Sequence, residues 1–275
     1  MSERRFAIGN AETGGERLLV IAGPCVVEER DLTLRTAEKL RDACAKRQLP
    51  FVFKASYRKA NRSSVRSFTG LPMETALAVL AEVRDTLGVP VLTDVHDERE
   101  VAAAAEVAEC LQIPAFLSRQ TTLLQAAGRT GRAVNVKKGQ FLAPDDMRQA
   151  AGKLTAAGCE RVLLTERGTT FGYHDLVVDM RGLVVMSGTG WPVVYDATHS
   201  LQRPGGEASG GNREFAFPLM RAALACGVDG LFFEAHPDPA RALSDAETQL
   251  PLDQAGRFLD QARALHAASR EARRG

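Results

Sequence analysis

Short apolar runs alternate with longer amphipathic stretches along nearly the whole chain, and this alternation constrains the fold more than any other feature. Alternating strand and helix patterns predict a parallel sheet. Eight such units in 275 residues predict an α/β fold, a single (β/α)8 TIM barrel domain over residues 1–275. A doubly wound sheet is disfavoured, because no G-x-G-x-x-G turn opens a helix. The predicted strands are 18–22, 50–54, 89–94, 109–113, 133–137, 161–165, 193–196 and 230–234, and the predicted helices include 28–47, 73–87, 97–107, 144–157, 213–226 and 251–271.

Two segments fall outside this alternation. Residues 5–10, ahead of the first strand, predict a short extra strand or hairpin that caps the bottom of the barrel. Residues 202–212 contain four glycines and a proline, which predicts a long mobile loop after the seventh strand. A lid over the site is the hypothesis for that loop.

Composition excludes several classes of partner. A net charge of +1 predicts no bulk attraction to nucleic acid or to an anionic membrane. No apolar stretch reaches the roughly 18 residues of a membrane span, and the charged N-terminus has no apolar segment typical of a signal peptide. Five scattered cysteines, an odd number, favour a reduced cytoplasmic protein without structural disulfides.

Polar residues gather at the C-terminal ends of the predicted strands, where TIM barrels have their active sites. One group is cationic, and its members would repel one another unless anions such as phosphates and a carboxylate bind among them. This cationic group comprises Lys54, Lys59, Arg62, Arg119, Lys137 and Arg167.

A second group, Cys25, His199, Glu234 and Asp245, combines a thiol, an imidazole and two carboxylates. Such donors suit a divalent Zn, Fe, Mn or Co ion. Their spacing does not establish a metal site, because the four residues are far apart in the chain. Taken alone, Cys25 is as well explained as a small buried hydrophobe, and a nucleophile activated by His199 is a third interpretation.

Six segments together resemble the 3-deoxy-D-manno-octulosonate-8-phosphate synthase family, and the resemblance runs from about residue 18 to residue 265. The most discriminating segment is 59–64 (KANRSS), since the related synthase of the shikimate pathway carries a Lys-Pro-Arg-Thr-Ser type segment there. The segments are 22–25 (AGPC), 53–64 (FKASYRKANRSS), 135–140 (NVKKGQ), 165–168 (TERG), 196–200 (DATHS) and 234–237 (EAHP).

The resemblance implies condensation of phosphoenolpyruvate with D-arabinose 5-phosphate and water, an early step of lipopolysaccharide (Kdo) biosynthesis, by a cytoplasmic homotetramer of barrels. It implies that a first set of residues holds the enolpyruvate: Lys54, Lys59, Lys137 and Arg167. It implies that Asn61, Arg62 and Ser63 hold the pentose phosphate, helped by Arg119 from a neighbouring subunit, and that Asp94 contacts the pentose. Gln120, next to Arg119 after the fourth strand, is a further candidate for substrate binding. Lys59 is also the candidate proton donor.

The family has a metal-dependent and a metal-independent class, and two features resemble the former. Metal-independent members have Asn at the position of Cys25, and a Cys-Asp-Gly-Pro type segment where this chain has 243–249 (LSDAETQ). The resemblance therefore implies that Cys25, His199, Glu234 and Asp245 are metal ligands, and Cys25, His199 and Asp245 join Lys59 in the catalytic set. One departure is Tyr57-Arg58, where many relatives have Phe-Asp.

Three alternatives stay open. A shikimate-type 3-deoxy-7-phosphoheptulonate synthase, which takes erythrose 4-phosphate, is disfavoured by segment 59–64. A sialic-acid-type synthase takes a non-phosphorylated sugar and has less need of Arg62 and Ser63. A non-catalytic sugar-phosphate sensor on a barrel scaffold is expected to lose some ligands or lysines, and this chain keeps all of them.

Overall fold

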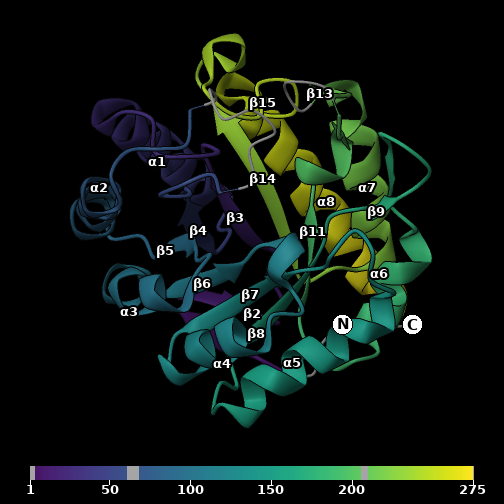
Figure 1. The fold of residues 1–275 in the computed structure, drawn as a ribbon. Helices are drawn as coiled ribbons and strands as arrows, with labels where there is room; N and C mark the ends of the chain where they lie inside the picture. The colour runs from purple at the N-terminus through teal and green to yellow at the C-terminus, as the bar shows by residue number, and fades with distance from the viewer. Residues whose placement is uncertain (1–3, 61–67, 206–209, 275) are drawn as a thin grey trace.

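Eight parallel strands close into a barrel in the computed structural model, which describes residues 4–60, 68–205 and 210–274 (Figure 1). The barrel closes because the last strand pairs with both the first and the seventh. Each strand lies within two residues of its predicted bounds, so the predicted TIM barrel is confirmed. In order around the barrel the strands are β3 (Leu19–Gly23), β4 (Phe51–Lys54), β5 (Val91–Asp94), β6 (Cys110–Ile113), β7 (Ala133–Lys137), β8 (Val162–Glu166), β11 (Val193–Asp196) and β14 (Gly230–His236).

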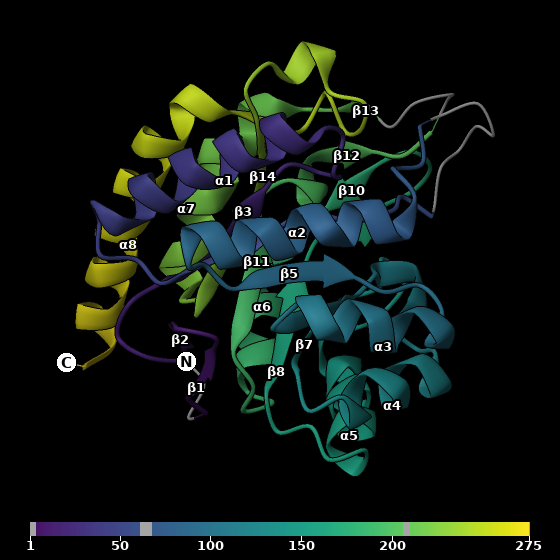
Figure 2. The ribbon, with the colours of Figure 1, turned by 90° about the vertical axis from the view of Figure 1, so that its left-hand side faces the viewer.

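Helices surround the barrel, and Figure 2 shows α1 to α4 following one another around its outside. The helices α4 and α6, of nine and eight residues, were not among those predicted, because so few residues show little more than two helical turns of periodicity. Within the described ranges, every helix is too short or too polar to cross a bilayer. The helices are α1 (Arg30–Ala45), α2 (Met73–Leu87), α3 (Glu98–Val107), α4 (Thr121–Arg129), α5 (Met147–Ala156), α6 (Met180–Ser187), α7 (Ala216–Cys226) and α8 (Ala255–Arg274).

The N-terminal segment forms an antiparallel hairpin of β1 (Phe6–Ile8) and β2 (Ala11–Thr13), which confirms the predicted extension. Ile8 and Ala11 are buried against the first inward-facing residues of the barrel strands. The hairpin therefore closes the N-terminal end of the barrel. The remaining strands are short additions: β9 (Thr169–Thr170) with β10 (Leu176–Val177), β12 (Gln202–Arg203) with β13 (Gly210–Gly211), and β15 (Leu250–Pro251) beside β14.

Alternate residues of each barrel strand face the barrel axis, and these inward positions change from apolar to polar toward the C-terminal end. Near the N-terminal end they form an apolar cluster separate from the core between strands and helices: Leu19, Val52, Leu92, Cys110, Ala133, Leu163, Val194 and Phe232. Two residues further along seven of the strands, the inward positions are polar and buried: Lys54, Asp94, Gln112, Asn135, Thr165, Asp196 and Glu234. The apolar layer inside the barrel and the polar layer of the candidate site are thus only two residues apart along each of these strands.

Candidate active site

A cavity of about 380 Å³ opens among the C-terminal ends of the barrel strands. Four of the six predicted cations line it, which confirms that these charges converge, and a fifth cation that was not in the set, Arg58, joins them. The remaining lining is part polar and part apolar and includes Phe116 and Leu117 from the segment after β6. The lining cations are Lys54, Arg58, Lys59, Lys137 and Arg167.

Each of the three lining lysines is paired with a carboxylate of the protein. Lys54 Nζ lies 2.8 Å from Glu234 Oε1, in a pair whose side chains are 1% and 0% exposed. Lys59 Nζ lies 3.1 Å from Asp245 Oδ2, and Lys137 contacts Asp196. A buried charge is costly unless it is paired, so these carboxylates reduce the repulsion among the three lysines.

Burial and pairing act differently on two of these lysines. Burial lowers the pKa of Lys54, but Glu234 and Asp94 more than offset it, so its pKa lies above the usual value. Burial lowers the pKa of Lys137 to about 8, against the opposing effect of Asp196. The pKa of Lys137 therefore lies closer to neutral pH than that of Lys54.

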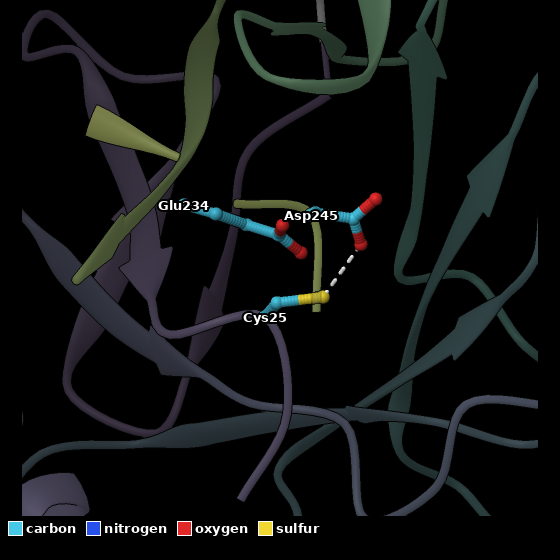
Figure 3. A group of neighbouring side chains, drawn as sticks. All are labelled: Cys25, Glu234 and Asp245. Carbon is cyan, nitrogen blue, oxygen red and sulfur yellow. Dashed lines mark hydrogen bonds between the residues drawn. The ribbon is translucent and has the colours of Figure 1, made fainter. Parts of the chain in front are cut away.

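Cys25, Glu234 and Asp245 converge on one point beside these pairs, as Figure 3 shows. One donor atom from each lies within 4.8 Å of the other two. The thiol of Cys25 donates to Asp245 Oδ2 at 2.7 Å. Glu234 Oε2 is buried and has no hydrogen-bond partner among the described residues. A thiol, two carboxylates and an unpartnered buried oxygen suit a divalent metal ion.

His199 lies beside this cluster but outside the 4.8 Å group. Its Nδ1 is 2.8 Å from Asp196 Oδ2, and its Nε2 is 3.8 Å from Glu234 Oε1. A carboxylate on one ring nitrogen fixes the orientation of an imidazole and leaves the other nitrogen available as a ligand. Asp196 thus aims His199 toward the three residues of the cluster. The sequence placed Asp196 at a strand end but assigned it no role.

Protonation in the cluster argues against a nucleophilic Cys25. Burial raises the pKa of the Cys25 thiol well above its usual value, and the carboxylates of Asp245 and Glu234 raise it further. Burial also raises the pKa of Asp245, but Lys59 and His199 more than offset it, so that pKa lies well below its usual value. No hydrogen bond joins His199 to Cys25 among the described residues. A reactive thiolate requires the opposite environment.

The loop that carries Asp245 is tied to Cys25 by side chains that the sequence did not single out. Asp245 has a φ of 48°, in the left-handed region that few non-glycine residues adopt. Gln249 accepts from the Cys25 amide at 3.3 Å and donates to the Ser244 carbonyl at 2.8 Å. Glu28 accepts from the Leu243 amide at 3.0 Å. Single polar residues in loops carry no periodic signal, which is why they were missed.

A chain of side-chain hydrogen bonds runs from strand to strand along one side of the barrel, and two of its members, Asp94 and Gln112, line the cavity. Asp94 accepts from Ser56 Oγ at 2.7 Å and from Gln112 Nε2 at 2.6 Å. Gln112 accepts from Asn135 at 2.9 Å, and Asn135 accepts from Thr165 at 2.6 Å. Four neighbouring strands are thereby joined through their inward residues. Burial raises the pKa of Asp94, but Lys54 and other neighbours lower it to about 2.

The other predicted site residues lie elsewhere. Arg119 and Gln120 are exposed just before α4 and are not among the residues that line the cavity. Asn61, Arg62 and Ser63 lie outside the described residues, as does part of the predicted lid, 206–209. The described ends of that loop pair as β12 and β13.

Comparisons with known proteins match this chain over nearly its whole length. The model of the DAHP synthetase I family matches residues 5–270. A curated relative from Trichlorobacter lovleyi, named 2-dehydro-3-deoxyphosphooctonate aldolase, is 53% identical over 97% of this chain and 99% of its own. Relatives of the same name from Geobacter metallireducens (53% identical, 96% of this chain and 98% of its own) and Syntrophobacter fumaroxidans (52% identical, 97% and 93%) are similar over nearly the same length.

We expect Gln112→Leu to destabilise the protein, because it keeps the volume but removes the hydrogen-bond partner of two buried atoms, Asp94 Oδ1 and Asn135 Nδ2. Each atom left without a partner costs about 1–3 kcal/mol, so the free energy of unfolding should fall by about 2–6 kcal/mol in urea titration. Thr165→Val, at the end of the hydrogen-bond chain, orphans one acceptor and should cost less. Equal losses for the two variants would contradict the continuous chain.

Proposed function

The chain belongs to the DAHP synthetase I family and, within it, to the 2-dehydro-3-deoxyphosphooctonate aldolases, and we propose that it condenses phosphoenolpyruvate with D-arabinose 5-phosphate and water. The products are 3-deoxy-D-manno-octulosonate 8-phosphate and inorganic phosphate, in Kdo biosynthesis. The observation that carries the proposal is the convergence of Lys54, Lys59, Lys137 and Arg167 on one cavity beside the Cys25 cluster. A phosphate and a carboxylate on one small substrate call for such a set of cations.

The cations bind and orient the enolpyruvate. Lys54 and Lys137 are held by buried carboxylates, so their ammonium groups keep fixed positions at the floor of the cavity. Arg167 donates from Nη2 to Gln202 at 2.7 Å, and its Nη1 is buried with no partner among the described residues. We assign that Nη1 to a substrate oxygen, because a buried unpaired guanidinium nitrogen is otherwise costly.

The bond changes follow from the substrates. The C3 carbon of the enolpyruvate attacks the pentose aldehyde carbon, whose oxygen takes up a proton, and water adds at C2 with loss of a proton. The resulting C2 centre expels inorganic phosphate and becomes the ketone. Positioned cations stabilise the charge that develops, and holding both substrates in one cavity removes much of the entropic barrier.

Two lysines are candidate proton carriers. The sequence favoured Lys59, but Asp245, Cys25 and Glu234 outweigh the effect of burial and raise its pKa well above the usual value. Lys137, with a pKa of about 8, is closer to the value that suits an acid at neutral pH. Both lysines line the cavity, so we keep Lys59 as the candidate proton donor and propose Lys137 as the alternative.

Cys25, Glu234 and Asp245, with His199 Nε2 turned toward them, are the residues we propose to hold a divalent metal. The unpartnered Glu234 oxygen and the mixed thiol and carboxylate donors support the fit. A bound Zn, Fe, Mn or Co ion would supply a Lewis acid for a carbonyl or water oxygen. Metal binding requires the Cys25 thiol to lose its proton, and the raised pKa of the free thiol makes that step pH-dependent.

The rival activities are weaker. The description of the family model names the seven-carbon synthase, but the relatives that are 52–53% identical carry the eight-carbon name. A non-catalytic sensor is disfavoured because every predicted cation and ligand within the described residues is retained, and most of them share one cavity.

The substrate assay is the direct test. With phosphoenolpyruvate present, we expect phosphate release with D-arabinose 5-phosphate to exceed release with D-erythrose 4-phosphate by at least about a hundredfold in kcat/KM, since a site built for polar groups rejects a shorter analogue. Preference for erythrose 4-phosphate would establish the rival synthase, and no release with either sugar would favour the sensor.

Metal removal tests the second part of the proposal. In calorimetry, we expect one equivalent of Zn²⁺ per chain to bind the protein after its metal has been removed with a chelator. Cys25→Ala should weaken this binding by about 100-fold or more, because a thiolate that ligates the metal directly is lost. Cys44→Ala is the matched control, since Cys44 is equally buried but lies on α1. Full activity of the verified metal-free wild type would contradict a catalytic metal.

We also propose a cytoplasmic homotetramer. All five cysteines are free, as a reduced compartment requires. Exposed apolar side chains, including Phe141 (57%), Phe171 (70%) and Val177 (44%), line a groove of about 660 Å³ beside α6. Such a patch is typical of a protein interface. A second copy is the occupant we infer, because the family resemblance implies that Arg119 serves a neighbouring subunit, and Arg119 does not line the cavity of its own chain.

Sedimentation equilibrium of the wild type should give four times the 29.7 kDa mass of the chain. Phe171→Asp should lower the measured mass, because a charge buried in an apolar interface is not solvated and destabilises the assembly. Phe215→Asp is the control, since Phe215 is also exposed (47%) but does not line the groove. A monomeric wild type would overturn the proposal.

A further inference from the structure

Arg58 lines the cavity, although it is absent from the cationic set that the sequence suggested. Its side chain is 44% exposed, whereas those of Lys54 and Lys137 are 1% and 5% exposed. This gradient places Arg58 at the mouth of the cavity and the two lysines at its floor. Arg58 is also half of the Tyr57-Arg58 pair that departs from the pattern of many relatives.

Glu100, in the first turn of α3, holds Arg58 in place. Arg58 Nη2 donates to Glu100 Oε1 at 2.7 Å. The other oxygen of Glu100 accepts from the Tyr57 hydroxyl at 2.5 Å and from the His96 amide at 3.2 Å. Tyr57 is fully buried, so this second oxygen is itself fixed. The loop after β4 and the loop after β5 are thus joined through one carboxylate.

The guanidinium retains most of its donors. Among the described residues, Arg58 makes one hydrogen bond, through Nη2, out of the five N–H groups that an arginine carries. A guanidinium held at one corner by a carboxylate presents its other edge to the cavity. That edge matches two oxygens of a phosphate, with which arginine forms paired, charge-assisted hydrogen bonds.

The chemistry of the proposed reaction decides which phosphate meets this edge. The aldehyde carbon of the pentose must reach the enolpyruvate, which the buried lysines hold at the floor. The phosphate of D-arabinose 5-phosphate is on the carbon at the other end of the chain. It therefore points outward, toward the mouth and Arg58.

We infer that Arg58 is a specificity-determining residue that binds the phosphate of the pentose substrate, and that Glu100 is the residue that positions it. This inference rests on the proposed function. It differs from a purely structural role, in which the contact of Arg58 with Glu100 only ties two loops together. A structural role affects every sugar equally, whereas a phosphate contact affects phosphorylated sugars alone.

The test compares Arg58→Gln with wild type on D-arabinose 5-phosphate and on unphosphorylated D-arabinose. We expect Arg58→Gln to raise KM for the sugar phosphate by about tenfold or more, as the loss of a hydrogen bond between charged groups predicts. The kcat and the KM for phosphoenolpyruvate should change less than about twofold. The kcat/KM for D-arabinose, or its Ki as a competitor where turnover is too slow, should not change.

Three further variants separate the roles. Arg58→Lys, which keeps the charge, should restore part of the affinity. Glu100→Gln should raise the same KM by a smaller factor. Arg99→Gln is the matched control, because Arg99 makes a similar 2.8 Å ion pair with Asp97 on the same helix but does not line the cavity.

An unchanged KM for D-arabinose 5-phosphate in Arg58→Gln overturns the inference while leaving the proposed function intact. An equal loss of kcat/KM with D-arabinose also overturns the inference and leaves the proposed function intact, and it assigns Arg58 a structural role. Absence of turnover by the wild type overturns the proposed function and this inference together.

Discussion

Closure of the barrel between β14 and β3 is the constraint on which the candidate site depends. The register of this parallel pair sets Glu234 beside Gly23. Cys25 is two residues further along the chain, so its sulfur lies within 4.8 Å of a Glu234 carboxylate oxygen, although the two residues are more than 200 positions apart in sequence. Gly23 also lets β3 lie close to β4 on its other side, because a Cβ at this position would stand 2.0 Å from the Lys54 carbonyl oxygen. Any larger residue there would push β3 away from β4, and with it the segment that leads to Cys25.

The electrostatics of the site follow from the same geometry. Four of the inward positions near the C-terminal end of the barrel are charged (Lys54, Asp94, Asp196 and Glu234), and burial makes each charge costly unless it has a partner. The structure meets this requirement with pairs such as Lys54 with Glu234 and Lys137 with Asp196. Charges paired in this way need little reorganisation when an anionic substrate enters, which is the condition for electrostatic catalysis. The ion pairs therefore lower the free-energy cost of burying these charges and also hold the charges in position for the reaction.

Much of this was predictable from the sequence because strands and helices have different periods. The eight apolar runs predicted the eight barrel strands, and the rule that sites form at the C-terminal ends of barrel strands gathered Lys54, Lys137 and Glu234 into one site. The prediction was weakest where a residue carries no periodic signal. The inward Gln112 interrupts an apolar strand, and Glu100 is an ordinary acidic residue in the first turn of a helix, so neither was distinguished from structural residues of the same type.

The sequence by itself determined the fold class, the position of the site along each strand and the kinds of chemistry available there, because these depend on local periodicity and residue type. Only the tertiary structure decided the partners. It showed that carboxylates of the protein pair with the three lysines, that Cys25 joins Asp245 and Glu234 while His199 is held by Asp196, and that Arg58 lines the cavity. Contacts between residues far apart in the chain depend on how the strands are paired and how the barrel closes, and no local pattern in a single sequence encodes the resulting distances.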